Sequence, residues 1–214
     1  MKKKVKKAAA KKPRINIANM ITLSRMALAP VIAATFFLDR AGMPLFYARI
    51  ITIALIIIAE LTDAFDGYAA RKFGQVSDMG KILDPFADSF YRFTIFATFM
   101  ATGYFPLWIL LVFFYRDSIV STLRILSGLS GVALAARMSG KIKAWVQAVG
   151  TFAVLALDLM RFNPFVNFDR MFGTAIPYQP IMFWVFAVVA AYTLYSGIDY
   201  LAGSYKLWGR LIKS

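Results

Sequence analysis

The 214-residue chain contains no cysteine and no histidine. Without cysteine it can form no disulfide, and it offers no thiolate as a nucleophile or metal ligand. Without histidine, a general base must be an aspartate, a glutamate, a lysine or a tyrosine. Acidic residues are also scarce: 11 stand against 25 lysines and arginines, giving a formal net charge of +14. A basic excess of this size favours an anionic partner, which can be nucleic acid, an anionic lipid surface or an anionic substrate.

Hydropathy and the position of the charges decide among these partners. The sequence is 60% hydrophobic and 17% charged, with a mean hydropathy of +0.63, whereas about half of a soluble domain is apolar. Eight basic residues lie between Lys2 and Arg14, directly before the first apolar run, as in a juxtamembrane anchor on an anionic leaflet. A solvated, structureless tail explains the same pattern. We expect a membrane protein with a basic cytoplasmic tail over 1–14, one domain over 15–214, and no nucleic-acid partner.

Six apolar runs approach the roughly 20 residues that a helix needs to cross a bilayer. They cover 21–38, 50–70, 83–101, 107–126, 142–160 and 181–201. With the N-terminus in the cytoplasm, the inner segments hold 17 basic residues and the outer loops hold 3, which satisfies the positive-inside rule. The sequence thus predicts an all-α integral membrane protein of the cell (inner) membrane, with six transmembrane helices and both termini cytoplasmic.

The few acidic residues are clustered. Six of them fall within 29 positions: Glu60, Asp63, Asp66, Asp78, Asp84 and Asp88. Two lie three apart at the end of the second expected span, and two lie four apart at the start of the third, so each pair shares one helix face. A short loop containing Gly74 and Gly80 is expected between the two helices. We therefore predict that Asp63, Asp66, Asp84 and Asp88 converge at the cytoplasmic interface.

Converging carboxylates near hydrocarbon are costly unless a cation lies between them. Oxygen ligands without histidine or cysteine favour Mg²⁺ or Mn²⁺ over zinc. Two such ions about 4 Å apart are a recurring device for phosphoryl displacement. Salt bridges from the acids to Arg71, Lys72 and Lys81 are the alternative explanation of the cluster.

Small residues follow the first aspartate pair along the second span. Gly67 and Ala70 leave a slot on the helix surface that a flat base or a phosphate can approach closely, and Arg71 adds a forked donor for a diphosphate. Ordinary packing of membrane helices through small residues explains Gly67 and Ala70 equally well.

The segment from Asp63 to Asp88 resembles the signature D-x2-D-G-x2-A-R-x8-G-x3-D-x3-D of the CDP-alcohol phosphatidyltransferases, and every fixed position matches. The resemblance implies a six-helix fold, usually homodimeric, that transfers a phosphatidyl or similar group from a CDP-linked donor to an alcohol and releases CMP. It implies that Asp88 is both a metal ligand and the base that takes the alcohol proton. The other implied ligands of the two Mg²⁺ (or Mn²⁺) ions are Asp63, Asp66 and Asp84, and the implied nucleotide contacts are Gly67, Ala70, Arg71 and Gly80.

Residues outside the signature resemble a bacterial subset of this family whose acceptor is glycerol 3-phosphate. The similar segments are 16–25, 116–124 and 140–147. Four cations there suit the phosphate of the acceptor, although the positive-inside bias with snorkelling side chains also places cations at such positions: Arg116, Arg124, Lys141 and Lys143. Three positions depart from the subset, with Ala18 replacing proline, Ser89 replacing lysine and Asp117 replacing glutamate. Inositol phosphate and choline-type acceptors therefore stay open.

Other classes of protein can also hold carboxylates in a membrane or bind anionic lipid. The site of a divalent-cation transporter generally lies near the midplane with access from both sides, whereas these acids cluster at one end of their helices. A membrane scaffold would use the lysine-rich tail and leave the aspartate spacing unexplained. The sequence favours an enzyme that takes CDP-diacylglycerol from the membrane and glycerol 3-phosphate from the cytoplasm to make phosphatidylglycerol phosphate.

Overall fold

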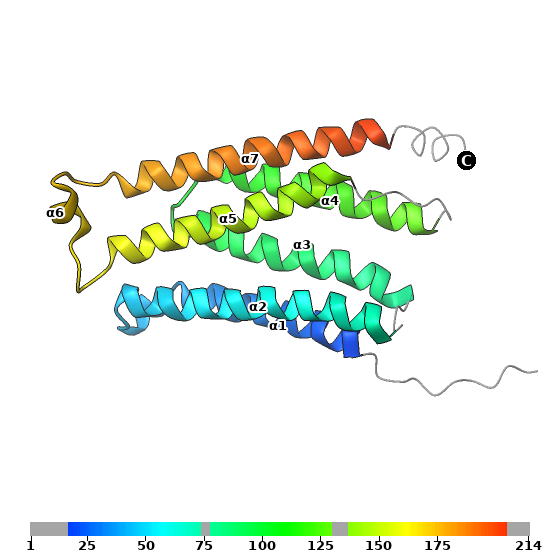
Figure 1. Ribbon diagram of the computed structural model, residues 1–214, viewed down its shortest axis with the longest axis horizontal. Helices are drawn as coiled ribbons and strands as arrows, with labels where there is room; N and C mark the ends of the chain where they lie inside the picture. The colour runs from blue at the N-terminus through cyan, green and yellow to red at the C-terminus, as the bar shows by residue number, and fades with distance from the viewer. Residues whose placement is uncertain (1–16, 74–77, 130–136, 205–214) are drawn as a thin grey trace, which may run out of the picture.

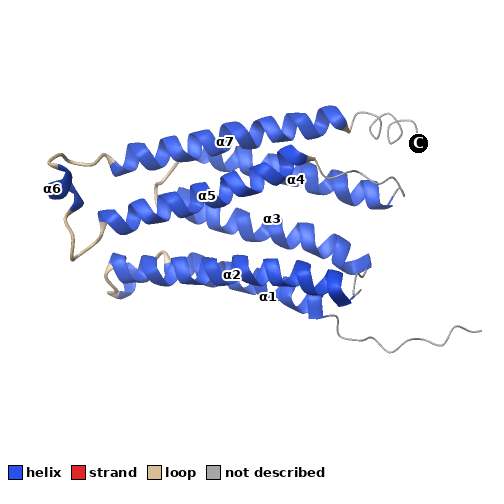
Figure 2. Cartoon of the chain, viewed as in Figure 1, coloured by secondary structure: helices blue, strands red, loops and turns tan. Residues whose placement is uncertain are grey.

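The computed structural model describes residues 17–73, 78–129 and 137–204, and over these residues the protein is helical, with no β-strand (Figures 1 and 2). The six long helices each contain most of one expected apolar run. The all-α prediction is confirmed for this part of the chain. The elements, in chain order, are α1 (Ile17–Thr35), the 3₁₀ turn η1 (Leu38–Ala41), α2 (Leu45–Phe73), α3 (Asp78–Ala101), α4 (Leu107–Leu129), α5 (Met138–Arg161), the short helix α6 (Phe168–Phe172) and α7 (Tyr178–Gly203).

Within the part of the chain that the structure describes, three helices are long and apolar enough to cross a membrane: α5 and α7 over their whole length, and α2 over Leu45–Thr62. In α1 the apolar stretch Thr22–Thr35 is shorter. The helices α3 and α4 are 24 and 23 residues long and carry charged side chains well inside their ends. These features are those of a helical membrane protein that also carries charged side chains inside its helices.

The six long helices pack as a closed ring. Around the ring, α1 packs against α2, α2 against α5, α5 against α7, α7 against α4, α4 against α3, and α3 against α1. All six lie roughly along the long axis of the molecule (Figure 1). We call the end of the bundle where α2 leads to α3 and α4 leads to α5 the site end. The opposite end, which holds η1 and α6, is the far end (Figure 1).

Aromatic side chains fill the ring toward the far end. Phe96 and Phe113 have ring centroids 4.5 Å apart, and Phe105 and Phe186 have centroids 4.6 Å apart. Phe99 is fully buried and packs against Phe186 at 5.4 Å. Such contacts stabilise the fold by burial and by favourable edge-to-face geometry. The aromatic core therefore fixes the far half of the helix ring.

A buried charged group lies beside this core. Arg49 on α2 forms an ion pair with Asp158 on α5, and their side chains are 5% and 1% exposed. The Tyr104 hydroxyl donates to the same carboxylate, and Arg49 Nη1 donates to the Phe36 carbonyl at 3.2 Å. Gly103, with φ of +84°, turns the chain between α3 and α4 directly before Tyr104. We call Arg49, Tyr104 and Asp158 the Arg49 cluster; it joins α2, α5 and the turn after α3.

Helix boundaries differ from the expected ones where charged residues lie inside a helix. The expected second span began at residue 50, after Arg49, but α2 begins at Leu45 and includes Arg49, whose buried charge is compensated by Asp158. Gly80 was expected in a loop, and that prediction is wrong, since α3 already begins at Asp78. An acidic residue at the amino end of a helix is stabilised by the helix dipole. Among the described residues, α2 ends at Phe73 and α3 begins at Asp78.

Candidate functional site

The four aspartates expected to hold metal lie on two consecutive helices. Asp63 and Asp66 are in the last three turns of α2, and Asp84 and Asp88 are in the first half of α3. All four positions therefore belong to the site-end portions of their helices. The side chains of 63–82, 84 and 85 lie outside the described residues, as do the expected nucleotide contacts, Gly67, Ala70, Arg71 and Gly80. Of the four aspartates, Asp88 is the one whose side-chain contacts the structure describes.

Asp88 begins a line of hydrogen bonds that crosses the helix ring. Arg92, one turn later on α3, donates from Nε to Asp88 Oδ1 at 2.9 Å and from Nη1 to Gln147 Oε1 on α5 at 3.4 Å. Gln147 Nε2 then donates to Thr193 Oγ1 on α7 at 3.3 Å. The Asp88 side chain is 42% exposed, whereas that of Arg92 is 16% exposed. Arg92 thus anchors one carboxylate oxygen of Asp88 while the group stays accessible.

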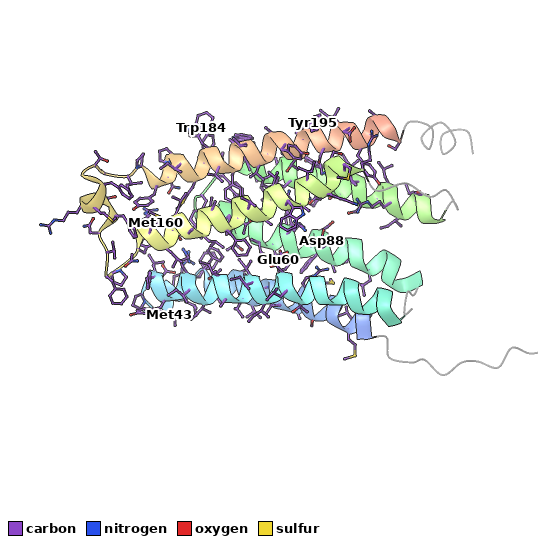
Figure 3. All side chains as sticks on the ribbon, in the orientation of Figure 1. Met43, Glu60, Asp88, Met160, Trp184 and Tyr195 are labelled. Carbon is purple, nitrogen blue, oxygen red and sulfur yellow. The ribbon has the colours of Figure 1, made fainter. Side chains whose placement is uncertain are left out.

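Glu60 on α2 faces the same region. It lines a small cavity together with Arg92 and Gln147, and Figure 3 labels Glu60 on α2 and Asp88 on α3. Its carboxylate lies on the face of α2 that also carries Ile56, another lining residue of this cavity. The polar interior at the site end therefore involves α2, α3 and α5 together.

A second polar group is centred on Asp117 of α4. Lys143 on α5 donates from Nζ to both carboxylate oxygens, at 2.8 and 3.0 Å. Arg116 donates from Nη1 to Asp117 Oδ1 at 2.9 Å and from Nε to Ser196 Oγ on α7 at 3.0 Å. Lys143 and Arg116 are only 4% and 9% exposed. Asp117 compensates part of this buried charge, and the contacts join α4, α5 and α7.

The guanidinium group of Arg116 reaches the amino end of α5. A Cβ on Gly140 would lie 3.6 Å from Arg116 Nη2 and 3.9 Å from Arg124 Nη2. Arg116 Nη2 is buried and has no hydrogen-bond partner within the described part of the chain. Arg124 is positioned by Tyr200, whose hydroxyl accepts from Arg124 Nε at 3.4 Å and whose ring lies under the guanidinium group. We call Arg116, Arg124 and Gly140 the anion pocket.

The chemistry of the anion pocket suits a phosphate group. The amino end of α5 carries the positive end of the helix dipole, which attracts anions. A buried donor without an acceptor costs free energy, and a phosphate oxygen beside Arg116 Nη2 removes that cost. Two guanidinium groups beside the amino end of α5 therefore offer donors suited to a tetrahedral anion.

The four cations expected to bind the acceptor phosphate separate into two groups. Arg116 and Arg124 meet at the anion pocket, and Lys143 joins Arg116 through Asp117. Lys141 is exposed. Residues two apart on a helix point in different directions, so Lys141 and Lys143 do not face the same space.

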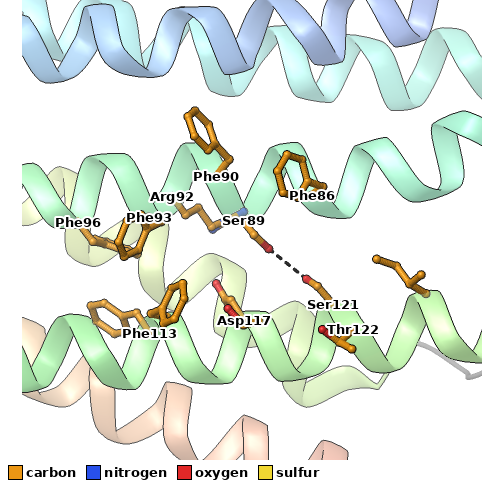
Figure 4. A pocket seen from close by; sticks show the side chains of 13 residues that line it. Phe86, Ser89, Phe90, Arg92, Phe93, Phe96, Phe113, Asp117, Ser121 and Thr122 are labelled. Carbon is orange, nitrogen blue, oxygen red and sulfur yellow. Dashed lines mark hydrogen bonds between the residues drawn. The ribbon is translucent and has the colours of Figure 1, made fainter.

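Two of the three departures from the family subset face one cavity. The space between α3 and α4 has a volume of about 290 Å³ and is lined by Ser89, Arg92 and Asp117 together with several phenylalanines. Ser89 Oγ and Ser121 Oγ are 3.0 Å apart and hydrogen-bonded across it (Figure 4). Serine is shorter than the lysine of the family subset, and the hydroxyl of Ser89 finds a hydrogen-bond partner in Ser121. Asp117 both lines this cavity and forms the ion pair with Lys143.

Several residues of the site were not singled out from the sequence. Arg92 could have been found, because it stands four residues after Asp88 on the same helix face, the usual spacing of an ion pair. Ser196 and Gly197 carry no such signal. A Cβ on Gly197 would lie 2.9 Å from Arg116 Cγ, so this glycine makes room for Arg116, but the two residues are far apart in the chain and only the fold brings them together.

The chain is similar in sequence to one known family of enzymes. The family model described as CDP-alcohol phosphatidyltransferase matches residues 15–195. A CDP-diacylglycerol–glycerol-3-phosphate 3-phosphatidyltransferase of Bacillus subtilis is 31% identical, over 89% of this chain and 96% of that protein. Proteins of the same name from Rickettsia bellii and Salmonella choleraesuis are each 30% identical, over 85% and 89% of this chain and 92% and 96% of their own lengths.

Proposed function

Because the chain belongs to the CDP-alcohol phosphatidyltransferase family, we propose that this enzyme transfers the phosphatidyl group of CDP-diacylglycerol to glycerol 3-phosphate. The products are phosphatidylglycerol phosphate and CMP, which makes the reaction a step of phospholipid biosynthesis. The relatives named above carry this donor and this acceptor in their names. The observation that carries the choice of acceptor is the anion pocket.

An acceptor that bears its own phosphate uses the anion pocket in full. In glycerol 3-phosphate that phosphate takes no part in the reaction, so it can serve as a handle that orients the molecule. Arg116 Nη2 and Arg124 Nη2 offer charge-assisted hydrogen bonds to it, and the positive end of the α5 helix dipole adds a favourable field. Choline has no anion for this pocket. Inositol phosphate does carry a phosphate for this pocket, so the choice between it and glycerol 3-phosphate depends on a direct comparison of the two acceptors.

The reacting hydroxyl needs a base, and Asp88 is the candidate on α3. The hydroxyl oxygen of the acceptor forms a bond to the phosphorus next to diacylglycerol, the bond from that phosphorus to the CMP oxygen breaks, and CMP leaves. Arg92 Nε holds Asp88 Oδ1, so Oδ2 is the oxygen placed to take the hydroxyl proton. Fixing one oxygen keeps the carboxylate in a single orientation, which general-base catalysis requires.

The donor set at the site end fits one or two Mg²⁺ or Mn²⁺ ions. It consists of carboxylates alone, Asp63, Asp66, Asp84 and Asp88, and hard oxygen ligands are those that these ions prefer. When bound, such ions polarise the phosphoryl oxygens and stabilise the charge on departing CMP. The described ligand, Asp88, is 42% exposed and can be reached by an ion. Chelation with EDTA should stop CMP release, and added Mg²⁺ should restore it.

The proposed reaction also has a place in the cell. We propose six transmembrane helices in the inner membrane, both termini in the cytoplasm and the site end facing the cytoplasm, since 17 basic residues lie on the inner segments. Glycerol 3-phosphate then enters from the cytoplasm, while CDP-diacylglycerol enters laterally from the bilayer. We also propose a homodimer, as the family resemblance implies.

The acceptor is tested with purified protein in lipid nanodiscs. CDP-diacylglycerol and Mg²⁺ are supplied with glycerol 3-phosphate, inositol 1-phosphate or choline, and CMP release is measured with the lipid product identified by mass. We expect glycerol 3-phosphate to give the highest kcat/KM, and Arg116→Gln to raise its KM. Arg161→Gln is the matched control, because Arg161 lies exposed at the far end. Preference for either other alcohol contradicts the proposed acceptor.

A further inference from the structure

Asp199, near the end of α7, binds the beginning of α5 at two points. Arg137, the residue that precedes α5, places Nε 3.0 Å from Asp199 Oδ2 and donates from Nη1 to the Asp199 carbonyl at 2.8 Å. Ser139, in the first turn of α5, donates from Oγ to Asp199 Oδ2 as well. Asp199 thus makes three contacts, one ion pair and two hydrogen bonds, with two residues at the start of α5. We call Arg137, Ser139 and Asp199 the α5 clasp.

The surface of α7 is shaped to receive this arginine. Gly203 lies one turn after Asp199, and a Cβ at that position would overlap the guanidinium group of Arg137. Any side chain at position 203 would therefore push Arg137 off α7. The bidentate use of an arginine fork also fixes orientation better than a single contact does. The α5 clasp therefore joins two helix ends through an ion pair, two hydrogen bonds and a close fit of Arg137 over Gly203.

The clasp stands directly beside the anion pocket. Gly140 follows Ser139, and its N–H donates to the Arg137 carbonyl at 3.2 Å, so the first turn of α5 is closed between the clasp and the pocket. Arg116, on the other side of the pocket, is held to the same stretch of α7 through Ser196. The segment of α7 from Ser196 to Gly203 therefore positions both walls of the anion pocket.

We infer that Asp199 is a positioning residue for the phosphate of the acceptor. Through Arg137 and Ser139 it holds the first turn of α5 beside Arg116 and Arg124, so that one phosphate can contact both guanidinium groups next to the amino end of the helix. Asp199 itself does not touch the acceptor. The inference rests on the proposed function, because it requires an acceptor that carries a phosphate.

The test compares Asp199→Asn with wild-type protein in nanodiscs. The substitution keeps the size of the side chain and removes the charge that Arg137 and Ser139 share. We expect the KM for glycerol 3-phosphate to rise about tenfold, the effect of weakening one charge-assisted contact. The kcat and the KM for CDP-diacylglycerol should stay within about twofold, because the reacting centre is not touched. Asp39→Asn, an exposed acid at the far end, is the matched control.

Two further variants separate positioning from folding. Ser139→Ala removes one hydrogen bond of the clasp and should raise the same KM by a smaller factor, even if Asp199→Asn folds poorly. Arg137→Gln combined with Asp199→Asn should raise the KM no more than either change alone, since both act through one contact. The inference is overturned if the KM effects of the two single changes add up in the double variant. It is also overturned if the variants lower kcat and raise the KM for both substrates, since that would show a general structural role.

The outcome also distinguishes this inference from the proposed acceptor. If wild-type protein uses glycerol 3-phosphate and the clasp variants leave its KM unchanged, the inference is wrong and the proposed function stands. If wild-type protein prefers inositol 1-phosphate, the proposed acceptor is wrong, and a raised KM for inositol 1-phosphate in Asp199→Asn still supports the clasp. If only a phosphate-free alcohol reacts, both are wrong.

Discussion

Gly197→Ala is the smallest change that should move the proposed acceptor-binding arginine. The added Cβ would meet Arg116 Cγ at 2.9 Å, and this atom is close to the backbone of α4, so it cannot swing away as a side-chain tip can. Adding a methyl group to a packed contact costs about 1 to 3 kcal/mol. If Arg116 leaves its place in the anion pocket to relieve the contact, this energy appears as lost phosphate binding. The KM for glycerol 3-phosphate should then rise between about 5-fold and 150-fold, because about 1.4 kcal/mol corresponds to a factor of ten.

The assay is steady-state CMP release with each substrate varied in turn, and Gly150→Ala is the matched control. A Cβ on Gly150 would lie 2.6 Å from Val189 Cγ2, between α5 and α7 and away from the anion pocket. This control should lower the thermal stability without changing the KM for glycerol 3-phosphate, whereas Gly197→Ala should change that KM with kcat little affected. If both variants change stability and kinetics in the same way, Gly197 does not act through Arg116, and the reasoning fails.

Three other changes test separate parts of the molecule. Asp88→Asn should lose most of kcat, since an amide cannot accept the hydroxyl proton; turnover at the wild-type rate would remove Asp88 as the base. The natural absence of cysteine lets single cysteines report topology: in intact cells an impermeant maleimide should label Phe165→Cys and not Ser214→Cys, and the reverse pattern would contradict the proposed orientation. Asp158→Leu should destabilise the protein by about 3 to 5 kcal/mol, because it leaves the charge of Arg49 buried and unpaired. The double variant with Arg49→Leu should regain most of that stability in a detergent unfolding experiment; no recovery would mean that the ion pair is not the cause.

Local patterns in the sequence were sufficient to predict the long helices but not their charged ends. Each apolar run corresponds to one long helix, because the requirement for a continuous apolar stretch is local. The start of α2 was placed too late because Arg49 looks like the end of a membrane span. Its partner Asp158 stands 109 residues later, so no window of neighbouring residues contains the compensating charge.

Some features of the candidate site follow from local sequence spacing, and others depend on contacts between distant helices. The spacing of Asp84, Asp88 and Arg92 on one helix can be worked out from helical periodicity alone. Periodicity could also have separated Lys141 from Lys143, because residues two apart point to different sides. The positions of Gly197 and Asp199 could not be predicted, since their roles depend on contacts between α7 and helices α4 and α5 that are distant in the chain.

The two ends of the helix ring differ in how they can open. The Arg49 cluster cannot lose one partner without leaving a charge or a hydroxyl unpaired in the aromatic core, so the far end has no partly open state of low energy. The first turn of α5 is held by the α5 clasp, whose Arg137 and Asp199 side chains are 39% and 25% exposed, so water can take the place of a broken contact. Local stability in proteins is uneven in this manner, and amide hydrogen exchange would detect it as strong protection around Phe99 and Phe186 and weak protection around Ser139. The proposed reaction must admit both a lipid and a soluble alcohol, and a site end that is less stable than the far end would let them enter while the aromatic core keeps the helices in place.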